Sequence, residues 1–311
     1  MARTPVIEIT NLRKTYGTTV AVDDVSLHVD AGEIFGVLGP NGAGKTTTVE
    51  CLAGLRTADA GSIRVLGHDP QRDPSSVREV LGVQLQSSRL PGKITVLEAL
   101  RLYASFYSDP ADAEELLDLL GLEAKRHTRF EALSGGQQQR LSIALALIGN
   151  PRVAILDELT TGLDPQARRD TWQLIEKVRD RGVTIVLVTH FMEEAERLCD
   201  RLAIIDAGRI VAEGSPAALI ADLEDRRTFR MRLSEPIDDD VLTSLADVDR
   251  VCHVGNEIEV TGTRTVLPAA MLALAELDVV PDEIRTLNRT LDDVFVARTG
   301  RDLTADSETL T

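Results

Sequence analysis

The stretch Gly39-Pro40-Asn41-Gly42-Ala43-Gly44-Lys45-Thr46 has the glycine, lysine and threonine spacing of a loop that binds phosphate. It follows the apolar run 34–38, which has strand character, and it precedes residues 46–54, which predict a helix ended by a glycine. In this context, backbone N–H groups and the helix N-terminus point their positive ends at an anion. The stretch therefore predicts an α/β fold that holds a nucleoside triphosphate.

Two side chains of this loop have distinct chemical roles. Lys45 can reach the β and γ phosphates, and the Thr46 hydroxyl can bind Mg²⁺, which prefers oxygen ligands that include a substrate phosphate. A glycine-rich turn that binds nothing is the alternative, and the flanking strand and helix argue against it. The residues expected to hold the nucleotide are Gly39, Pro40, Asn41, Gly42, Ala43, Gly44, Lys45, Thr46 and Thr47.

A second apolar run, Val153-Ala154-Ile155-Leu156, ends in two adjacent carboxylates, Asp157 and Glu158. It predicts a buried parallel strand that delivers both acids to its C-terminal edge, where open α/β sheets bind ligands. Asp157 is the expected magnesium ligand, and Glu158 can polarise a water for attack on the γ-phosphate. A third strand, over 184–189, ends in His190. A solvated strand end is the alternative for the two acids, but the convergence of these segments favours catalysis.

Together with several further motifs, these segments resemble the nucleotide-binding subunit of an ATP-binding cassette (ABC) transporter. The resemblance covers residues 5–220, and its most specific part is the signature Leu133-Ser134-Gly135-Gly136-Gln137, followed by Gln138-Gln139-Arg140. The other matching segments are Tyr16 in Lys14-Thr15-Tyr16-Gly17, the phosphate loop, Gln86 after Leu81-Gly82-Val83-Gln84-Leu85, the strand ending in Asp157-Glu158, the turn Gly162-Leu163-Asp164, and His190.

The resemblance implies an ATPase that uses Mg²⁺ and couples ATP hydrolysis to transport. It implies the α/β P-loop NTPase fold of ABC type, with a mixed sheet core and a helical lobe at about 87–150. Residues 1–222 are then the nucleotide-binding domain, 223–300 a small C-terminal α+β domain, and 301–311 a polar tail.

The resemblance adds two residues to the nucleotide site. Tyr16 would stack its ring on the adenine, because any base has a π-face to offer; an ordinary aromatic residue at a strand end is the alternative. Gln86 would touch Mg²⁺ or the attacking water through its amide, and so sense the γ-phosphate. Gln84 lies two residues earlier, on the same strand face, and is the competing assignment. The family position after the Leu-Gly-Val run favours Gln86.

The signature implies that one copy of the chain is not enough. It exposes backbone N–H groups and a hydroxyl at the start of a helix expected over 137–148, which makes a second anion site. In the family, two subunits pack head to tail, and each ATP lies between the phosphate loop of one subunit and the signature of the other. Asp164 would lie in the turn at that interface, and His190 would join the γ-phosphate to this turn. A homodimer, or a heterodimer with a similar chain, is expected. The signature residues assigned to the nucleotide are Ser134, Gly135, Gly136 and Gln137.

One position departs from the family pattern. The residue after the catalytic glutamate is usually proline, and here it is Leu159, followed by Thr160-Thr161. Leucine frees φ and supplies an N–H, so we expect a less rigid strand end with activity retained. The placement of Glu158 is what this change puts in question.

The composition of the chain limits its partners. A net charge of −16 over 311 residues argues against a nucleic-acid partner, which would need clustered basic residues. Cys51, Cys199 and Cys252 are isolated and no secretory leader is evident, which indicates a reducing, cytosolic setting. No apolar run approaches the roughly eighteen residues that span a bilayer, so the membrane part of a transporter is expected to be another chain. We expect a peripheral protein at the cytoplasmic face of the cell membrane.

Two regions are expected to matter for that membrane partner. Helices predicted at 95–107 and 111–120 belong to the lobe that, in the family, carries the groove for the permease; their apolar residues fit either a core or an interface. The region after residue 222 resembles the C-terminal extension of drug-resistance ATPases of the daunorubicin-resistance group, whose permeases are of the ABC-2 class. It is expected to stabilise the dimer or the permease contact, with ligand sensing as the alternative. Its predicted elements are strands at 228–233 and 257–260 and helices at 268–277 and 290–299.

Two classes of function remain open from the sequence. The first is the ATPase subunit of an exporter of drug or lipid-like compounds, which dimerises around two ATP to drive a separate permease. The second is a soluble, non-transport ABC ATPase that acts on ribosomes or DNA. A single cassette, a spacing of about ninety residues between phosphate loop and signature, and the acidic charge all favour the first.

Overall fold

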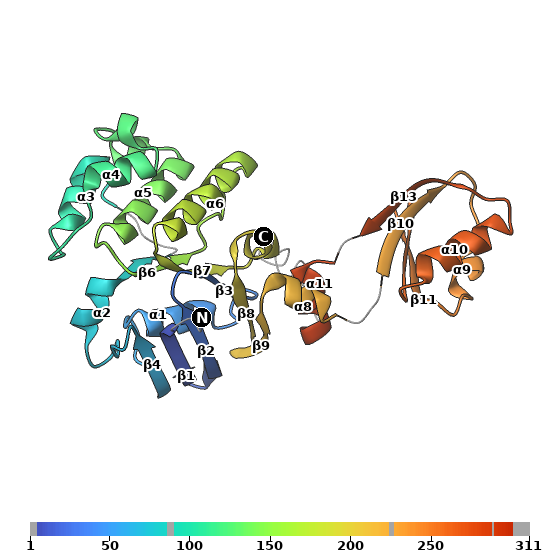
Figure 1. The fold of residues 1–311 in the computed structure, drawn as a ribbon, viewed down its shortest axis with the longest axis horizontal. Helices are drawn as coiled ribbons and strands as arrows, with labels where there is room; N and C mark the ends of the chain where they lie inside the picture. Colours follow the sequence, from blue (N-terminus) through green and yellow to red (C-terminus); the bar gives the residue numbers. More distant parts are fainter. Residues whose placement is uncertain (1–4, 86–89, 224–226, 288, 301–311) are drawn as a thin grey trace. The chain divides into compact units, whose positions relative to one another are not determined.

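The computed structural model describes residues 5–85, 90–223, 227–287 and 289–300. By their contacts these residues form two compact units: the first comprises the residues up to Ala217 together with 298–300, and the second runs from Ala218 to Ala297. The division lies within the short helix α8 (Pro216–Ala221), just before the boundary at 222 that the sequence predicts. Figure 1 labels the elements of both units.

The first unit is built on a six-stranded sheet with the order β5-β6-β7-β3-β8-β9. All neighbouring pairs in it are parallel except β8 and β9, which are antiparallel. Every residue of β3, β6 and β7 is buried, as parallel strands covered on both faces require, and the strands predicted at 34–38 and 184–189 are confirmed. The bounds are β3 (Ile34–Leu38), β5 (Leu81–Gln84), β6 (Val153–Asp157), β7 (Thr184–Thr189), β8 (Arg201–Asp206) and β9 (Arg209–Gly214).

A second, three-stranded antiparallel sheet has the order β2-β1-β4. Its inward residues, such as Ile7 and Val25, share one apolar cluster with Phe35, Ile155 and Val188 of the larger sheet. Helix α1 contributes to the same cluster, so the loop that precedes it is fixed between the two sheets. The bounds are β1 (Pro5–Tyr16), β2 (Thr19–Asp30), β4 (Ala60–Val65), α1 (Lys45–Leu52) and α2 (Pro74–Val80).

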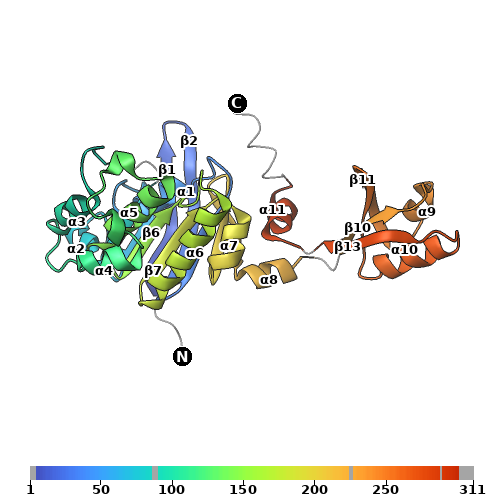
Figure 2. The same ribbon diagram turned by 90° about the horizontal axis from the view of Figure 1, so that it is seen from above.

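Three of the remaining helices of this unit group together, and a side chain caps the start of each of these three. Figures 1 and 2 show α3 (Val96–Ala104), α4 (Ala113–Leu119) and α5 (Gly135–Leu147) grouped together beside the larger sheet. Ser134 caps α5 in a capping box with Gln137, so this helix begins before residue 137, where the sequence predicted its start. The other bounds are η1 (Glu123–Lys125), η2 (Phe130–Ala132), α6 (Pro165–Asp180) and α7 (Met192–Leu198).

The second unit is a four-stranded antiparallel sheet with the order β11-β12-β10-β13. Phe229, Met231 and Val260 of its central strands pack with α10 in one apolar cluster. The sequence predicts the two central strands but misses the edge strands β11 and β13, because few of their side chains are buried and their alternation is weak. The bounds are β10 (Arg227–Leu233), α9 (Asp240–Thr243), β11 (Val248–Val254), β12 (Glu257–Gly262), α10 (Val266–Ala275), β13 (Pro281–Leu287) and α11 (Leu291–Thr299).

Candidate functional site

The loop before α1 and the first turn of that helix line an open pocket of about 510 Å³. Gly44 has a φ of 103°, and a Cβ there would lie 2.3 Å from the carbonyl oxygen of Ala21, so a larger residue does not fit where the loop passes β2. The N-terminus of α1 adds its positive dipole end, which suits a polyphosphate. The lining residues are Ala21, Asn41, Gly42, Ala43, Gly44, Lys45, Thr46, Thr47, Glu158, Thr161 and His190.

Lys45 is the cation of this pocket. Its side chain is buried, and its ammonium donates hydrogen bonds to the carbonyl oxygens of Gly39 (2.7 Å) and Pro40 (2.9 Å). Burial lowers the pKa of the Lys45 ammonium, and the carboxylates of Glu158 and Asp157 oppose that effect. The ammonium is therefore held at the pocket by neutral carbonyl oxygens, which phosphate oxygens can replace with a stronger, charge-assisted bond.

Asp157 places a buried carboxylate beside the loop pocket. The residue is 1% exposed, and neither carboxylate oxygen has a hydrogen-bond partner among the described residues. Burial, followed by the negative charge of Glu158, raises the pKa of Asp157 to about 6. A buried carboxylate in this state is costly unless a cation joins it. This donor fits Mg²⁺, and the Thr46 hydroxyl on the pocket wall provides a second oxygen ligand of the same hard type.

Glu158 and His190 meet at the edge of the pocket. His190 Nδ1 lies 3.2 Å from Glu158 Oε1, and both side chains are only partly exposed. Glu158 has a φ of 50°, a left-handed conformation that is uncommon outside glycine, and its N–H donates to the Val188 carbonyl (2.9 Å). A following proline would push Glu158 toward extended backbone, so the leucine at 159 is compatible with this geometry. The Leu159 side chain itself is buried.

The signature lines a different pocket, of about 380 Å³. Asp164 caps α6 by accepting from the N–H groups of Gln166 and Ala167, each at 2.9 Å. The 162–164 turn lines this pocket together with the start of α5. The two pockets have no lining residue in common. Within one copy, the two predicted anion-binding ends therefore stay apart. The second pocket is lined by Ser134, Gly135, Gly136, Gln137, Arg140, Gly162, Leu163, Asp164, Gln166, Ala167 and Asp170.

The sequence predicts that Tyr16 contacts the adenine base and that Gln86, or else Gln84, contacts the attacking water. Tyr16 ends β1, is 40% exposed, and is not among the residues that line the loop pocket. Lys14 Nζ and the Arg56 guanidinium lie 5.6 and 5.4 Å from the centre of its ring. Gln86 lies outside the described residues. Gln84 is buried, with its Oε1 accepting from the Asp157 N–H and its Nε2 donating to the Leu85 carbonyl. Both ends of the Gln84 amide are thus engaged, which argues against the competing assignment.

Two residues that line the loop pocket are not predicted from the sequence. Thr161 lines the loop pocket beside Glu158, and its signal was the threonine pair that precedes the glycine turn. Ala21 comes from β2 and brings its backbone against Gly44, and no motif marks it. Backbone that arrives from a different strand carries no side-chain signature, so only the fold reveals it.

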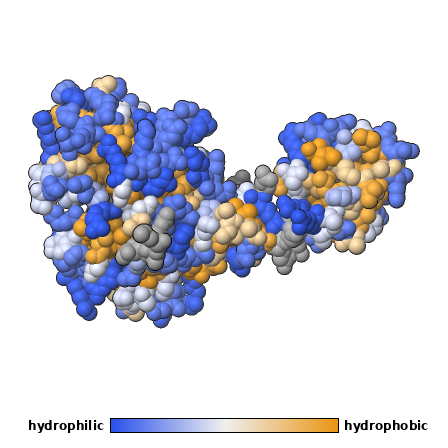
Figure 3. Space-filling view, viewed as in Figure 1, coloured by the Kyte–Doolittle hydropathy of each residue, from blue (hydrophilic) through white to orange (hydrophobic). Residues whose placement is uncertain are grey.

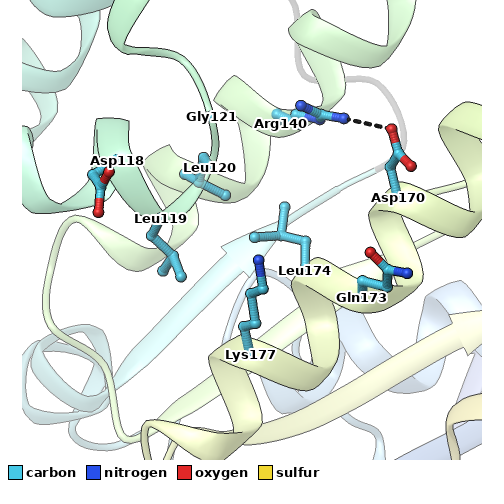
Figure 4. A pocket seen from close by; sticks show the side chains of 9 residues that line it. All are labelled: Asp118, Leu119, Leu120, Gly121, Arg140, Asp170, Gln173, Leu174 and Lys177. Atoms are coloured by element: carbon cyan, nitrogen blue, oxygen red, sulfur yellow. Dashed lines mark hydrogen bonds and ion pairs between the residues drawn. The ribbon is translucent and has the colours of Figure 1, made fainter.

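A third pocket, of about 220 Å³, lies between α4 and α6 (Figure 4). Figure 4 shows Lys177 pointing into it and Arg140 bonded to Asp170, at 3.1 Å, on one side. Arg140 and Asp170 also line the signature pocket, so this ion pair separates the two hollows. Acids and bases alternate around the third pocket, and it has neither a glycine loop nor a strand end to hold a triphosphate.

The chain is similar to known proteins along most of its length. A family model described as ABC transporter matches residues 22–161. The Nod factor export ATP-binding protein I of Paraburkholderia xenovorans (strain LB400) is 40% identical over 96% of this chain and 98% of its own length. The protein of the same name from Cupriavidus metallidurans is 46% identical over 70% of this chain and 73% of its own.

Solved structures resemble the same kind of protein. An ATP-binding subunit of an ABC transporter has a TM-score of 0.63 at 30% identity and covers 70% of this chain and 92% of its own. A dimeric ATP-binding cassette in a post-hydrolysis state, bound to ADP and Pi, has a TM-score of 0.60 at 28% identity, over 67% of this chain and 98% of its own. The mixed sheet with its helical group is therefore a known arrangement.

Proposed function

We propose that two copies of this chain share two ATP and drive export. The premise is that the chain belongs to the family of ABC transporter ATP-binding subunits and is an ATPase coupled to transport. The names of the relatives and of the solved structures refer to ATP or ADP binding, and the loop pocket described above would hold the nucleotide here.

The observation that carries this proposal is the separation of the two anion-binding pockets within one copy. The phosphate loop and the signature line different hollows. Head-to-tail pairing would place the signature of one copy over the phosphate loop of the other. The dimeric cassette with ADP and Pi supports the pairing of two copies. Each ATP would then contact both copies, so closure would depend on the nucleotide.

Within the loop pocket, the residues would divide the work as follows. Lys45 and the loop N–H groups would bind the β and γ phosphates, and Tyr16 would stack on the adenine. Glu158 would orient a water and accept its proton as the water oxygen bonds to the γ-phosphorus and the bond to ADP breaks. His190, beside Glu158, would donate to the γ-phosphate. From the partner copy, Ser134 and its neighbours would complete the site, with Asp164 in the turn beside them.

Mg²⁺ would be held by Asp157 and Thr46, with Gln86 as a further ligand or as a contact to the attacking water. The buried carboxylate of Asp157, which has no hydrogen-bond partner among the described residues, supports this assignment. When bound, the ion would neutralise charge on the phosphate oxygens.

The partner is proposed to be a separate membrane subunit of the ABC-2 class. Both relatives carry export in their names, and one matches nearly the whole chain. None of the helices in the described part of the chain has the length and apolar character for a membrane crossing. We place the protein at the cytoplasmic face of the membrane, with a drug or lipid-like compound as cargo.

The helical group α3–α5 is the proposed contact surface for that subunit. Leu102 in α3 is 48% exposed and the nearby Phe106 is 67% exposed. Figure 3 shows apolar surface over the part of the unit that contains these helices. Exposed apolar surface of this kind marks interaction sites, so these side chains can pack against cytoplasmic helices of a partner. For the C-terminal unit, we propose a role in stabilising the dimer or this contact.

Glu158→Gln tests the assignment of the water-activating residue. The variant should bind ATP as the wild type does and lose turnover by about 100-fold or more, because the amide cannot take the proton. It should also accumulate as an ATP-bound dimer, measured by size-exclusion chromatography with light scattering. Wild-type turnover in this variant would remove Glu158 from the mechanism.

Mixing two inactive variants tests the shared site. Lys45→Ala removes the phosphate-loop cation, and Gly135→Asp puts a negative charge into the signature, where a side chain has open space. A mixture should recover turnover, because a mixed dimer has one intact loop facing one intact signature. As the control, Lys45→Ala mixed with the doubly changed chain has no intact loop and should recover nothing. Absence of recovery in the first mixture would count against sharing.

A further inference from the structure

Three side chains form a continuous stack from α6 to the edge of the loop pocket that Glu158 and His190 line. The guanidinium carbon of Arg168 in α6 lies 5.0 Å from the ring centre of Phe191, and the Phe191 ring lies 4.0 Å from the His190 ring at an interplanar angle of 40°. His190 Nδ1 in turn lies 3.2 Å from Glu158 Oε1. The orientation of the His190 imidazole is thus set from one side by Phe191 and from another by Glu158.

The other contacts of Arg168 indicate that stacking is its main task. Its Nε is buried and has no hydrogen-bond partner among the residues that the structure describes. Its Nη1 is 4.0 Å from a carboxylate oxygen of Glu193, whose side chain is 76% exposed, and such an ion pair contributes little. A guanidinium over an aromatic face gains from the ring quadrupole, and more so when both are partly desolvated.

A second contact joins helix α6 to helix α7. Trp172, one turn further along α6, donates from Nε1 to the buried Glu194 Oε1 of α7 at 3.0 Å. Helix α6 starts directly after Asp164, which caps it, and α7 starts directly after Phe191. The stack therefore joins the element that carries the 162–164 turn to the residue that precedes α7.

We propose that Arg168 and Phe191 are positioning residues that hold the His190 imidazole in the orientation needed for the γ-phosphate. This inference rests on the proposed function, because it takes His190 as the γ-phosphate contact. Without the Phe191 face the imidazole can turn about its side-chain bonds, and its productive orientation becomes one of several. Because the stack starts on α6, movement of the turn when two copies meet would reach His190 through Arg168.

The test uses steady-state ATPase kinetics of the full chain. Arg168→Met keeps the length of the side chain without the charge, and Phe191→Leu keeps an apolar side chain without the ring. Each should lower kcat by about 3- to 30-fold, the range expected for losing one cation–π contact, with KM for ATP changed less than about twofold. Phe191→Tyr keeps the ring and should restore near-wild-type kcat. The double variant should be no slower than Phe191→Leu alone, because both changes break the same stack.

The controls separate this role from general stability. Arg179→Met changes another arginine of α6, whose partner Asp180 is its neighbour in the chain, and should leave kcat unchanged. Trp172 is the only tryptophan of the chain, so an unchanged emission spectrum in Arg168→Met would show that α6 and α7 still pack together. Unchanged kcat in both stack variants, multiplicative losses in the double variant, or no rescue by tyrosine would overturn the inference.

His190→Ala distinguishes the two levels of proposal. Loss of turnover in His190→Ala, together with wild-type kcat in Arg168→Met, would refute the positioning role alone. Wild-type turnover in His190→Ala would refute the assignment of His190 in the proposed function, whatever the stack variants do.

Discussion

Gln84 and Asp157 are joined by a hydrogen bond at the ends of two neighbouring parallel strands: the Gln84 Oε1 accepts from the Asp157 backbone N–H at 3.0 Å. The bond satisfies a buried N–H and fixes the end of β6 against β5. It leaves the Asp157 carboxylate with no hydrogen-bond partner among the described residues. Gln84 thus holds the backbone of Asp157, the proposed magnesium ligand, in place without occupying its carboxylate.

Gln84→Leu should weaken both the fold and the metal site. The change leaves a buried N–H without an acceptor, which costs about 1–3 kcal/mol of unfolding free energy. It also loosens Asp157, so the Mg²⁺ concentration for half-maximal ATPase should rise severalfold. Urea unfolding and a Mg²⁺ titration of ATPase activity measure the two effects.

Gln71→Leu is the matched control, because Gln71 is exposed in a loop before α2. It should change neither quantity. A Gln84→Leu protein with lowered stability but an unchanged Mg²⁺ requirement would show that the hydrogen bond does not position Asp157.

The raised pKa of Asp157, about 6 against an ordinary value of 3.8, makes stability depend on pH. The folded state binds this proton more tightly than the unfolded state, so the contribution is full below about pH 4 and is lost as the pH rises through about 6. Asp157→Asn removes the buried charge. In the absence of nucleotide and Mg²⁺, it should raise the unfolding free energy at pH 7.5 by roughly 2 to 3 kcal/mol and have little effect at pH 4.

Asp59 provides a control of opposite sign. Hydrogen bonds from Lys14 and Thr15 lower the pKa of Asp59 to about 2, so its contribution is present above about pH 4 and is lost as the pH falls through about 2. Asp59→Asn should therefore lower the unfolding free energy at pH 7.5, where Asp157→Asn raises it. Urea unfolding of both variants from pH 4 to 8 checks this. A constant difference between Asp157→Asn and wild type across that range would contradict the account.

Much of the fold and of the candidate site follows from local sequence pattern. Fully apolar runs such as 34–38 and 184–189 are unambiguous because parallel strands are buried on both faces. The signature helix was misplaced at its start only because the Ser134 cap lies inside the motif. The acids of 157–158 follow from a strand that ends at a sheet edge.

What the sequence could not supply depends on contacts between distant segments. The Ala21 backbone in the loop pocket, the Gln84 bond and the left-handed Glu158 all arise where separate strands meet. The edge strands β11 and β13 expose most of their side chains, so alternation was too weak to mark them. Periodicity reports which face is buried, and it carries no information about which neighbour covers that face.

Lys45→Ala should weaken nucleotide binding about 10- to 100-fold, because hydrogen bonds to a charged group typically contribute 1.5–3 kcal/mol. Titration of a fluorescent ATP analogue at equilibrium measures this without depending on turnover. Lys177→Ala is the control: Lys177 is an exposed lysine that points into the pocket between α4 and α6 (Figure 4). It should leave affinity unchanged. A larger loss of affinity in Lys177→Ala than in Lys45→Ala would show that the nucleotide binds in that other pocket.

Tyr16 can be tested by separating the base from the phosphates. Tyr16 is 40% exposed, so its ring offers surface to a base, and Lys14 and Arg56 lie 5.6 and 5.4 Å from the ring centre. Tyr16→Ala should lower ATP affinity about 5- to 100-fold, the range for losing one base stack, while affinity for inorganic triphosphate stays unchanged. Tyr16→Phe keeps the face and should bind ATP as the wild type does. Equal losses for ATP and triphosphate in Tyr16→Ala would show that Tyr16 acts on the phosphate loop, and the adenine would then need another partner.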